Sequence, residues 1–286
     1  MAARSNRRAV QRVRRRSRLW PRLKAVQRFA RRRWREAGTV FHAVSKTPLA
    51  TRVLIGSVVV LLLFLTVNWI FHAITKPTEV LFALDRSLDK SLTESWQEYG
   101  PLFREHATSV ITPELLAALA QVEGNGNPVA RTYWRWKWSV NPLTWYQPAS
   151  TAVGMFQLTD ATFHTARRYC IHDHHVAEDG PWHDHHSCWF NSLYTRVIPS
   201  HAIEMTAALL DHRVTRELAT RPQATPQQKH NLAAVIHLCG ARAGHDFVLR
   251  RFRLTSHQRC GDHDVRTYLT RVQLLKQQFI TLNTER

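Results

Sequence analysis

The chain has 286 residues and a formal net charge of +19 at pH 7, a length that allows one or two domains. Residues 1–52 hold 17 Lys and Arg against one Glu, a net +16, whereas the rest holds 23 basic against 20 acidic residues, a net +3. The charge therefore belongs to a tail, and the remainder lacks the composition of a nucleic-acid-binding domain. We expect the tail to contact anionic lipid, because nothing in it suggests specific readout of a nucleic acid.

The segment after the tail predicts a membrane-spanning helix over residues 53–72. Val53 to Phe71 contains no charged side chain, and as a helix it is about 28 Å long, close to the hydrocarbon thickness of a bilayer. The Arg-rich tail favours a cytoplasmic N-terminus, and Trp69 suits the far interface. A cleaved signal peptide is disfavoured, because the basic and apolar segments are both too long for one. We therefore expect a single-pass signal anchor with the rest of the chain outside.

Residues 77–95 predict a helical connector, because apolar residues recur there at helical spacing. That stripe consists of Val80, Leu81, Leu84, Leu88 and Leu92. Pro101 predicts a break in the helix shortly afterwards. We expect residues 96–286 to form one mainly α-helical domain.

Within this domain, an apolar run ends in a carboxylate. Thr112 is a suitable N-cap, Pro113 suits the first helical position, and the Gly/Asn/Pro run after Glu123 predicts the end of the helix. The spacing places Glu123 on the face of Leu116, Leu119 and Ala120. Burial of that face and the negative end of the helix dipole both favour a protonated carboxyl, which can act as a general acid. A solvated or salt-bridged Glu is the alternative.

Residues 133–138 alternate aromatic and cationic side chains, and a turn signal follows at Asn141-Pro142. This alternation has the period of a strand and predicts a small hairpin that reaches Tyr146. The aromatic residues could bind a ligand, or they could pack on the core or on a nearby membrane.

A second motif, Ala-Val-Gly-Met-Phe-Gln-Leu-Thr, spans residues 152–159. Gly154 permits close approach of the backbone, and Gln157 can donate and accept hydrogen bonds, unless it is a core amide bonded to the backbone. Together with the Glu123 helix, this motif resembles the lytic transglycosylases of the soluble type (SLT domain), in the lysozyme-like superfamily. In that family a helix ends in the catalytic Glu, and a Gly-Leu-Met-Gln-like turn lines the sugar cleft.

The resemblance implies a lysozyme-like domain with a small β-wing, placed in the periplasm by an anchor in the inner membrane. It implies cleavage of the β-1,4 bond between N-acetylmuramic acid and N-acetylglucosamine in peptidoglycan, without a cofactor. Glu123 would act first as acid and then as base, which gives 1,6-anhydro ends. The substrate-binding residues that it suggests are Gly154, Met155, Phe156, Gln157, His237, Trp136 and Tyr146.

The chain departs from this family at three places. The family commonly has Ser after the catalytic Glu, where this chain has Gly124. The family also shows Ala-Tyr-Asn-Ala-Gly, whose Tyr orients the carboxyl, whereas residues 236–240 read Ile-His-Leu-Cys-Gly and place His237 at the Tyr position. The spacing between Glu123 and Gly154 is longer than usual. Residues 198–218 and 231–240 predict amphipathic helices, and the second of them ends in the His237 segment.

Four cysteines lie beyond the apolar span, where disulfides persist, and they allow three pairings. We favour Cys170–Cys188 and Cys239–Cys260, because each closes a local loop of about twenty residues. The His- and Asp-rich loops around Cys170 and Cys188 could suggest zinc. No metal is expected, because the ligand spacing is irregular and oxidation would remove both thiolates.

Three rival functions remain open at this stage. One is a hydrolase of the same fold, which needs a second carboxylate, and Asp160, Asp173 and Asp184 are the candidates. Another is a non-catalytic wall-binding or secretion-assembly protein. The last is an adaptor that binds nucleic acid or lipid through its basic tail.

Overall fold

The computed structural model describes residues 42, 45–76, 78–80, 86–184, 186–219 and 223–284. The chain separates into two compact units, residues 1–67 and 68–286. Most of the predicted basic tail lies outside the described residues. The predicted boundary at residue 96 separates no units, because Asn68 and Glu79 already make contacts inside the second unit.

The division between the units falls within helix α2 (Leu49–Thr75). By its length and composition, α2 could cross a membrane. It begins four residues before the predicted 53–72 segment and ends three residues after it. The hydroxyls of Thr66 and Thr75 donate to carbonyls one turn earlier, so these polar side chains are satisfied within the helix itself.

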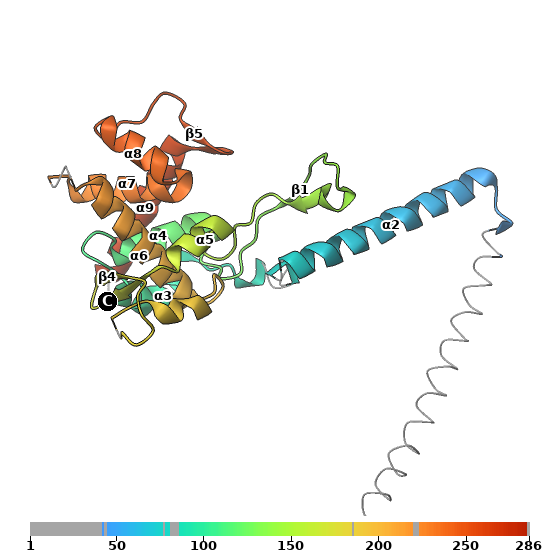
Figure 1. Ribbon diagram of the computed structural model, residues 1–286. Coiled ribbons are helices and arrows are strands. Elements are labelled where there is room, and N and C mark those ends of the chain that lie inside the picture. Colours follow the sequence, from blue (N-terminus) through green and yellow to red (C-terminus); the bar gives the residue numbers. More distant parts are fainter. Residues whose placement is uncertain are drawn as a thin grey trace, which may run out of the picture. The chain divides into compact units, whose positions relative to one another are not determined.

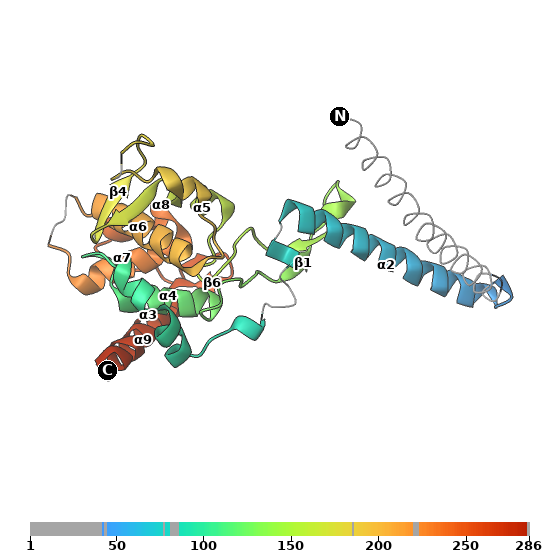
Figure 2. The same ribbon diagram turned by 90° about the horizontal axis from the view of Figure 1, so that it is seen from below.

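The second unit is mainly helical, as predicted (Figure 1). Its further helices are α3 (Leu92–Glu105), α4 (Pro113–Gly124), α5 (Asp160–Ala166), α6 (Pro199–Glu217), α7 (Pro226–Cys239), α8 (Ala241–Leu249) and α9 (Val265–Thr284). Short 3-10 turns lie at Arg86–Leu88, Pro142–Thr144 and Trp189–Leu193. Helix α4 packs against α3 and α9, and α7 packs against α6 and α8 (Figure 2).

Helix α4 is the centre of the core and forms as the sequence predicts. The Thr112 hydroxyl accepts from the Leu115 N–H, and Pro113 occupies the first turn. Asn125 ends the helix in the left-handed conformation. The side chains from Leu115 to Ala120 are all buried, as in a helix that is surrounded by others.

The predicted connector helix over residues 77–95 is wrong for the part that the structure describes. Residues 78–80 and Arg86–Leu88 form 3-10 turns, and the next helix begins at Leu92. A capping box of Ser91 and Glu94 sets that start, because each side chain satisfies an N–H that has no partner inside the helix. The predicted break at Pro101 is also wrong, since α3 continues to Glu105 with buried aromatic residues on both sides of the proline.

The predicted hairpin is present. Strand β1 (Trp134–Trp136) pairs antiparallel with β2 (Tyr146–Pro148), and Trp136 lies opposite Tyr146. We call residues 134–148 the wing. Two further hairpins join β3 (Tyr169–His172) to β4 (His175–Glu178), and β5 (Arg259–Cys260) to β6 (His263–Asp264).

The helices predicted over residues 198–218 and 231–240 are confirmed as α6 and α7. Helix α7 begins before residue 231, because Thr225 and Gln228 form a second capping box ahead of Pro226. The long C-terminal helix α9 was not predicted, although it packs its whole length against the core through Val265, Leu269, Val272 and Phe279.

Both predicted disulfides are present, Cys170–Cys188 and Cys239–Cys260. The first joins β3 to the turn before Trp189. The second joins the end of α7 to β5. They close loops of 18 and 21 residues.

We expect the Cys170→Ser/Cys188→Ser double variant to lose about 3 kcal/mol of unfolding free energy, because the unfolded chain regains loop entropy. Denaturant unfolding followed by circular dichroism measures the loss. Thiol titration of the unreduced, denatured wild type should find no free sulfhydryl. A full complement of reactive thiols would contradict the pairing.

Candidate functional site

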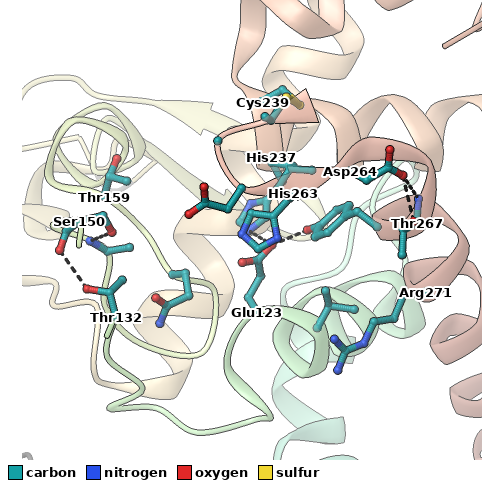
Figure 3. Close-up of a pocket in the computed structure, with 18 of the residues that line it drawn as sticks. Glu123, Thr132, Ser150, Thr159, His237, Cys239, His263, Asp264, Thr267 and Arg271 are labelled. Carbon is teal, nitrogen blue, oxygen red and sulfur yellow. Dashed lines mark hydrogen bonds and ion pairs between the residues drawn. A yellow bond between two sulfur atoms is a disulfide. The ribbon is translucent and has the colours of Figure 1, made fainter. Parts of the chain in front are cut away.

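A cavity of about 900 Å³ lies where six segments of the second unit meet (Figure 3). These segments are the end of α4, the strand entry at 131–133, the motif at 150–159, the end of α7, the β5–β6 hairpin and the start of α9. The cavity size falls within the range of small-molecule binding sites. The polar and charged side chains in its wall include Glu123, Arg131, Gln157, His237, Asp262, Asp264, Tyr268 and Arg271.

Glu123 lies in the last turn of α4, and 15% of its side chain is exposed, toward the cavity. The Tyr268 hydroxyl donates to Glu123 Oε1 at 2.5 Å. Tyr268 comes from the first turn of α9, and its ring is buried where α9 packs on α4. One carboxyl oxygen is therefore held by a fixed donor, while the second has no partner in the described part of the chain.

Tyr268 is a donor across the whole physiological pH range. Burial raises the pKa of Tyr268 well above its usual value, and the neighbouring Glu123 carboxylate raises it further. The phenol keeps its proton as a result, and the contact with Glu123 stays an O–H···O hydrogen bond.

His237 lies on the other side of the same carboxyl. Its Nε2 is 3.8 Å from Glu123 Oε1, which is too long for a hydrogen bond. Burial lowers the pKa of His237, although Glu123 and a backbone hydrogen bond with Phe156 oppose that shift. We therefore interpret the contact as one between the carboxyl and a neutral imidazole, not as an ion pair.

The two sequence motifs meet through their backbones. A Cβ on Gly124 would lie 2.9 Å from Met155 Cα and 3.2 Å from the Gly154 carbonyl oxygen. Gly154 itself has φ +84°, and a Cβ there would lie 2.3 Å from the Arg196 carbonyl oxygen. The glycine at position 124 is thus needed for the end of α4 to fit against the second motif.

The structure brings part of the predicted site together. Gln157 and His237 line the cavity with Glu123. Gln157 Nε2 donates to the Ala130 and Gly154 carbonyls. Its amide nitrogen is therefore bonded to the backbone, which was the alternative to a role in substrate binding. Met155 and Phe156 are buried in the core behind the cavity, and they do not reach its wall.

The prediction for Trp136 and Tyr146 needs a correction. Both lie in the wing, where their rings pack on each other at 4.9 Å, and neither lines the cavity. The cavity wall includes residues 131–133 but no residue of the two strands of the wing. Of this aromatic segment, Tyr133 is the member that borders the cavity, and its hydroxyl donates to Asp262 at 3.1 Å.

The second carboxylates also differ from those predicted. Asp160, Asp173 and Asp184 do not line the cavity, and Asp160 pairs with Arg196 at 2.7 Å. Asp262 and Asp264 from the β5–β6 hairpin line it instead. The backbone N–H and hydroxyl of Thr267 donate to Asp264 and hold the pKa of that carboxyl below its usual value.

Among the described residues, no three His, Cys, Asp or Glu side chains are grouped so that they could hold a metal ion. Cys170 and Cys188, which suggested zinc, are oxidised to a disulfide. The cavity around Glu123 has groups that suit proton transfer, because a buried carboxyl, a phenol donor and a neutral imidazole face it.

Tyr268, which bonds to Glu123 at the cavity, is the site residue that the sequence did not predict. A signal existed, because Val265, Tyr268, Leu269 and Val272 lie on one helical stripe. A tyrosine within a buried stripe needs a partner for its hydroxyl. The identity of that partner, 145 residues earlier in the chain, depends on how α9 packs.

Comparison with known family models, curated proteins and solved structures finds no match to this chain.

We expect Gly124→Ala to lower the unfolding free energy by about 1–3 kcal/mol, because the added methyl overlaps a backbone that cannot move aside. Gly100→Ala is the matched helical control, since its Cβ would meet the flexible end of Arg104 at 3.4 Å. Denaturant unfolding compares the two. Equal stability of both variants would contradict the close fit at Gly124.

We expect Tyr268→Phe to lower the unfolding free energy by about 1–3 kcal/mol, because Glu123 loses its fixed donor in a largely buried position. Tyr133→Phe removes a hydroxyl from an exposed ring at the same cavity, and its effect should stay within about 0.5 kcal/mol. An equal loss of unfolding free energy in the two variants would contradict a stabilising role for the hydrogen bond from Tyr268 to Glu123.

Proposed function

We propose that this chain is a membrane-anchored peptidoglycan lytic transglycosylase on a lysozyme-like domain. The observation that carries the proposal is Glu123, a largely buried carboxyl that faces a cavity and receives a hydrogen bond from Tyr268. Within the described part of the chain, no Lys or Arg lies within salt-bridge distance of this carboxyl. A carboxyl in this setting suits a general acid better than a structural ion pair.

The proposed reaction uses Glu123 twice. The Tyr268 O–H occupies Oε1, so the acidic proton belongs on Oε2, from which it passes to the glycosidic oxygen between N-acetylmuramic acid and N-acetylglucosamine. The carboxylate then takes the proton of the C6 hydroxyl of the muramic acid while that oxygen attacks C1. The product is a 1,6-anhydro ring, and no water is consumed.

Tyr268 and His237 have supporting roles in this proposal. Tyr268 fixes the rotamer of the carboxyl and stabilises its charge after the first proton transfer. This is the role that the resemblance suggested for the position of His237. His237 Nε2 is 3.8 Å from the carboxyl, too far to donate a hydrogen bond to it, so His237 does not take the place of Tyr268. The departure at His237 is therefore compensated from α9.

The proposed location follows from charge and redox state. Helix α2 would cross the inner membrane, with the basic tail in the cytoplasm and the second unit in the periplasm. The two disulfides agree with an oxidising compartment.

One observation favours a second candidate, a lysozyme-type hydrolase. Asp264 lines the same cavity, and its lowered pKa keeps it ionised, as a base or nucleophile in hydrolysis requires. Mass analysis separates the two reactions, because a hydrolase leaves reducing ends and a transglycosylase leaves anhydro ends. Under our proposal, Asp264→Asn should keep the anhydro product.

We expect Glu123→Gln to lower muropeptide release from purified sacculi by about 100-fold or more, because an amide cannot donate the proton. Glu114→Gln is the control, since Glu114 lies at the other end of α4 and bonds to the exposed Asn283. Mass spectrometry of the digests measures both variants, and circular dichroism checks their folds. Undiminished release by Glu123→Gln rules out the mechanism, and binding of sacculi without release by the wild type indicates a non-catalytic wall protein.

A further inference from the structure

The wing lies along the last two turns of α2 and is hydrogen-bonded to them. Asn68 Nδ2 donates to the Leu143 carbonyl at 2.7 Å, and His72 Nε2 lies 3.0 Å from the same oxygen. The Trp134 ring meets His72 edge-on at 5.2 Å. These contacts all lie within the second unit.

The base of the wing is tied to the end of α2 by a buried carboxylate. Glu79 is fully buried and pairs with Lys76 at 3.1 Å and with Arg131 at 2.8 Å. It also accepts from Trp134 Nε1 at 3.1 Å. Lys76 Nζ donates further to the Ser150 carbonyl, just beyond β2. The direction of the wing relative to this helix end is thus fixed at both its base and its tip.

These contacts place the tip of the wing beside Asn68, closer to the middle of α2 than Lys76 is. Lys76 is the first charged residue after the apolar run of α2, so it marks the membrane surface if α2 spans a bilayer. Asn68 is eight residues earlier, which is about 12 Å along the helix axis. Because Leu143 is bonded to Asn68, the tip reaches the boundary between headgroups and acyl chains.

The tip also has the composition of an interfacial segment. Trp138 is 87% exposed and Val140 is fully exposed, although both are apolar. Arg135 and Lys137 alternate with the aromatic residues and can extend to lipid phosphates.

Several polar groups of the tip are paired within the tip itself. Trp145 Nε1 donates to the Ser139 carbonyl, and Asn141 Oδ1 accepts from the Leu143 N–H. The hydroxyls of Ser139 and Thr144 bond to each other and to the Asn141 carbonyl. A loop whose polar groups bond internally loses little when it leaves water.

We propose that the tip of the wing, residues 136–145, inserts into the interface of the bilayer beside α2. Trp138 and Val140 lie at the level of the upper acyl chains, and Arg135 and Lys137 bind anionic headgroups. The inference rests on the membrane-anchoring part of the proposed function and not on the chemistry at Glu123. The wing then holds the cavity at a set height and orientation over the membrane, because Arg131 at its base also lines the cavity.

The full chain in nanodiscs tests the proposal. Tryptophan emission is recorded in discs of ordinary lipid and in discs whose acyl chains carry bromine near the headgroup end, which quenches only nearby indoles. Wild type is compared with Trp138→Phe and with Trp182→Phe. Trp182 is similarly exposed and follows β4, which lies across the helical body from β1 in both views (Figures 1 and 2).

We expect the emission that Trp138 contributes, wild type minus Trp138→Phe, to lose most of its intensity in brominated discs. The emission that Trp182 contributes should be unchanged. The proposal is overturned if bromine quenches the Trp138 emission no more than it quenches the Trp182 emission. It is also overturned if Trp138→Phe loses binding to sacculi, because the wing would then bind glycan.

Alkaline carbonate extraction of membranes separates this failure from failure of the anchor. A chain that stays in the membrane while Trp138 is unquenched refutes the wing contact alone. A chain that carbonate releases refutes the anchor and the wing contact together. The muropeptide assay of wild type and Glu123→Gln tests the chemistry separately from the anchor and from the wing contact.

Discussion

The fit of the last turn of α4 against the second motif is the constraint on which the rest of the site depends. Gly124 permits backbone contact with Gly154 and Met155, and this contact aims the preceding side chain, Glu123, into the cavity instead of the core. Packing of α9 on α4 then supplies the Tyr268 hydroxyl. The energy of this arrangement comes from burial of the apolar side chains of α4, and the carboxyl lies in the last turn of that helix, at the wall of the cavity.

Local signals made much of the fold predictable. The caps of α4, the alternation in β1 and the cysteine spacing each act over a few residues or close a short loop, and each was confirmed. The predicted connector helix was wrong because an apolar stripe of this length fits both a helix and short turns. The choice between them depends on which parts of the core pack against the stripe. Tyr268 could not be paired with Glu123 from the sequence, because that contact depends on how two distant helices pack. The direction of the wing, and with it the position of Trp136, depends on its contacts with α2.

Glu79 connects the wing to the end of α2 and to the wall of the cavity. It is buried with Lys76 at the end of α2, with Trp134 in the wing and with Arg131 in the wall of the cavity. A buried carboxylate is stable only when its partners stay in place, so the cluster favours one relative position of these three segments. The proposed enzyme would act on a polymer that lies at a limited distance from its membrane, and a rigid junction limits the distance at which the cavity can work.

The Cys239–Cys260 disulfide lies in the wall of the cavity, between the helix that carries His237 and the hairpin that precedes α9. This bond ties α7 covalently to the hairpin, which contributes Gly261, Asp262 and His263 to the wall. Reduction of Cys239–Cys260 would therefore remove a covalent tie between two sides of the cavity, and the shape of the cavity depends on the redox state of this pair.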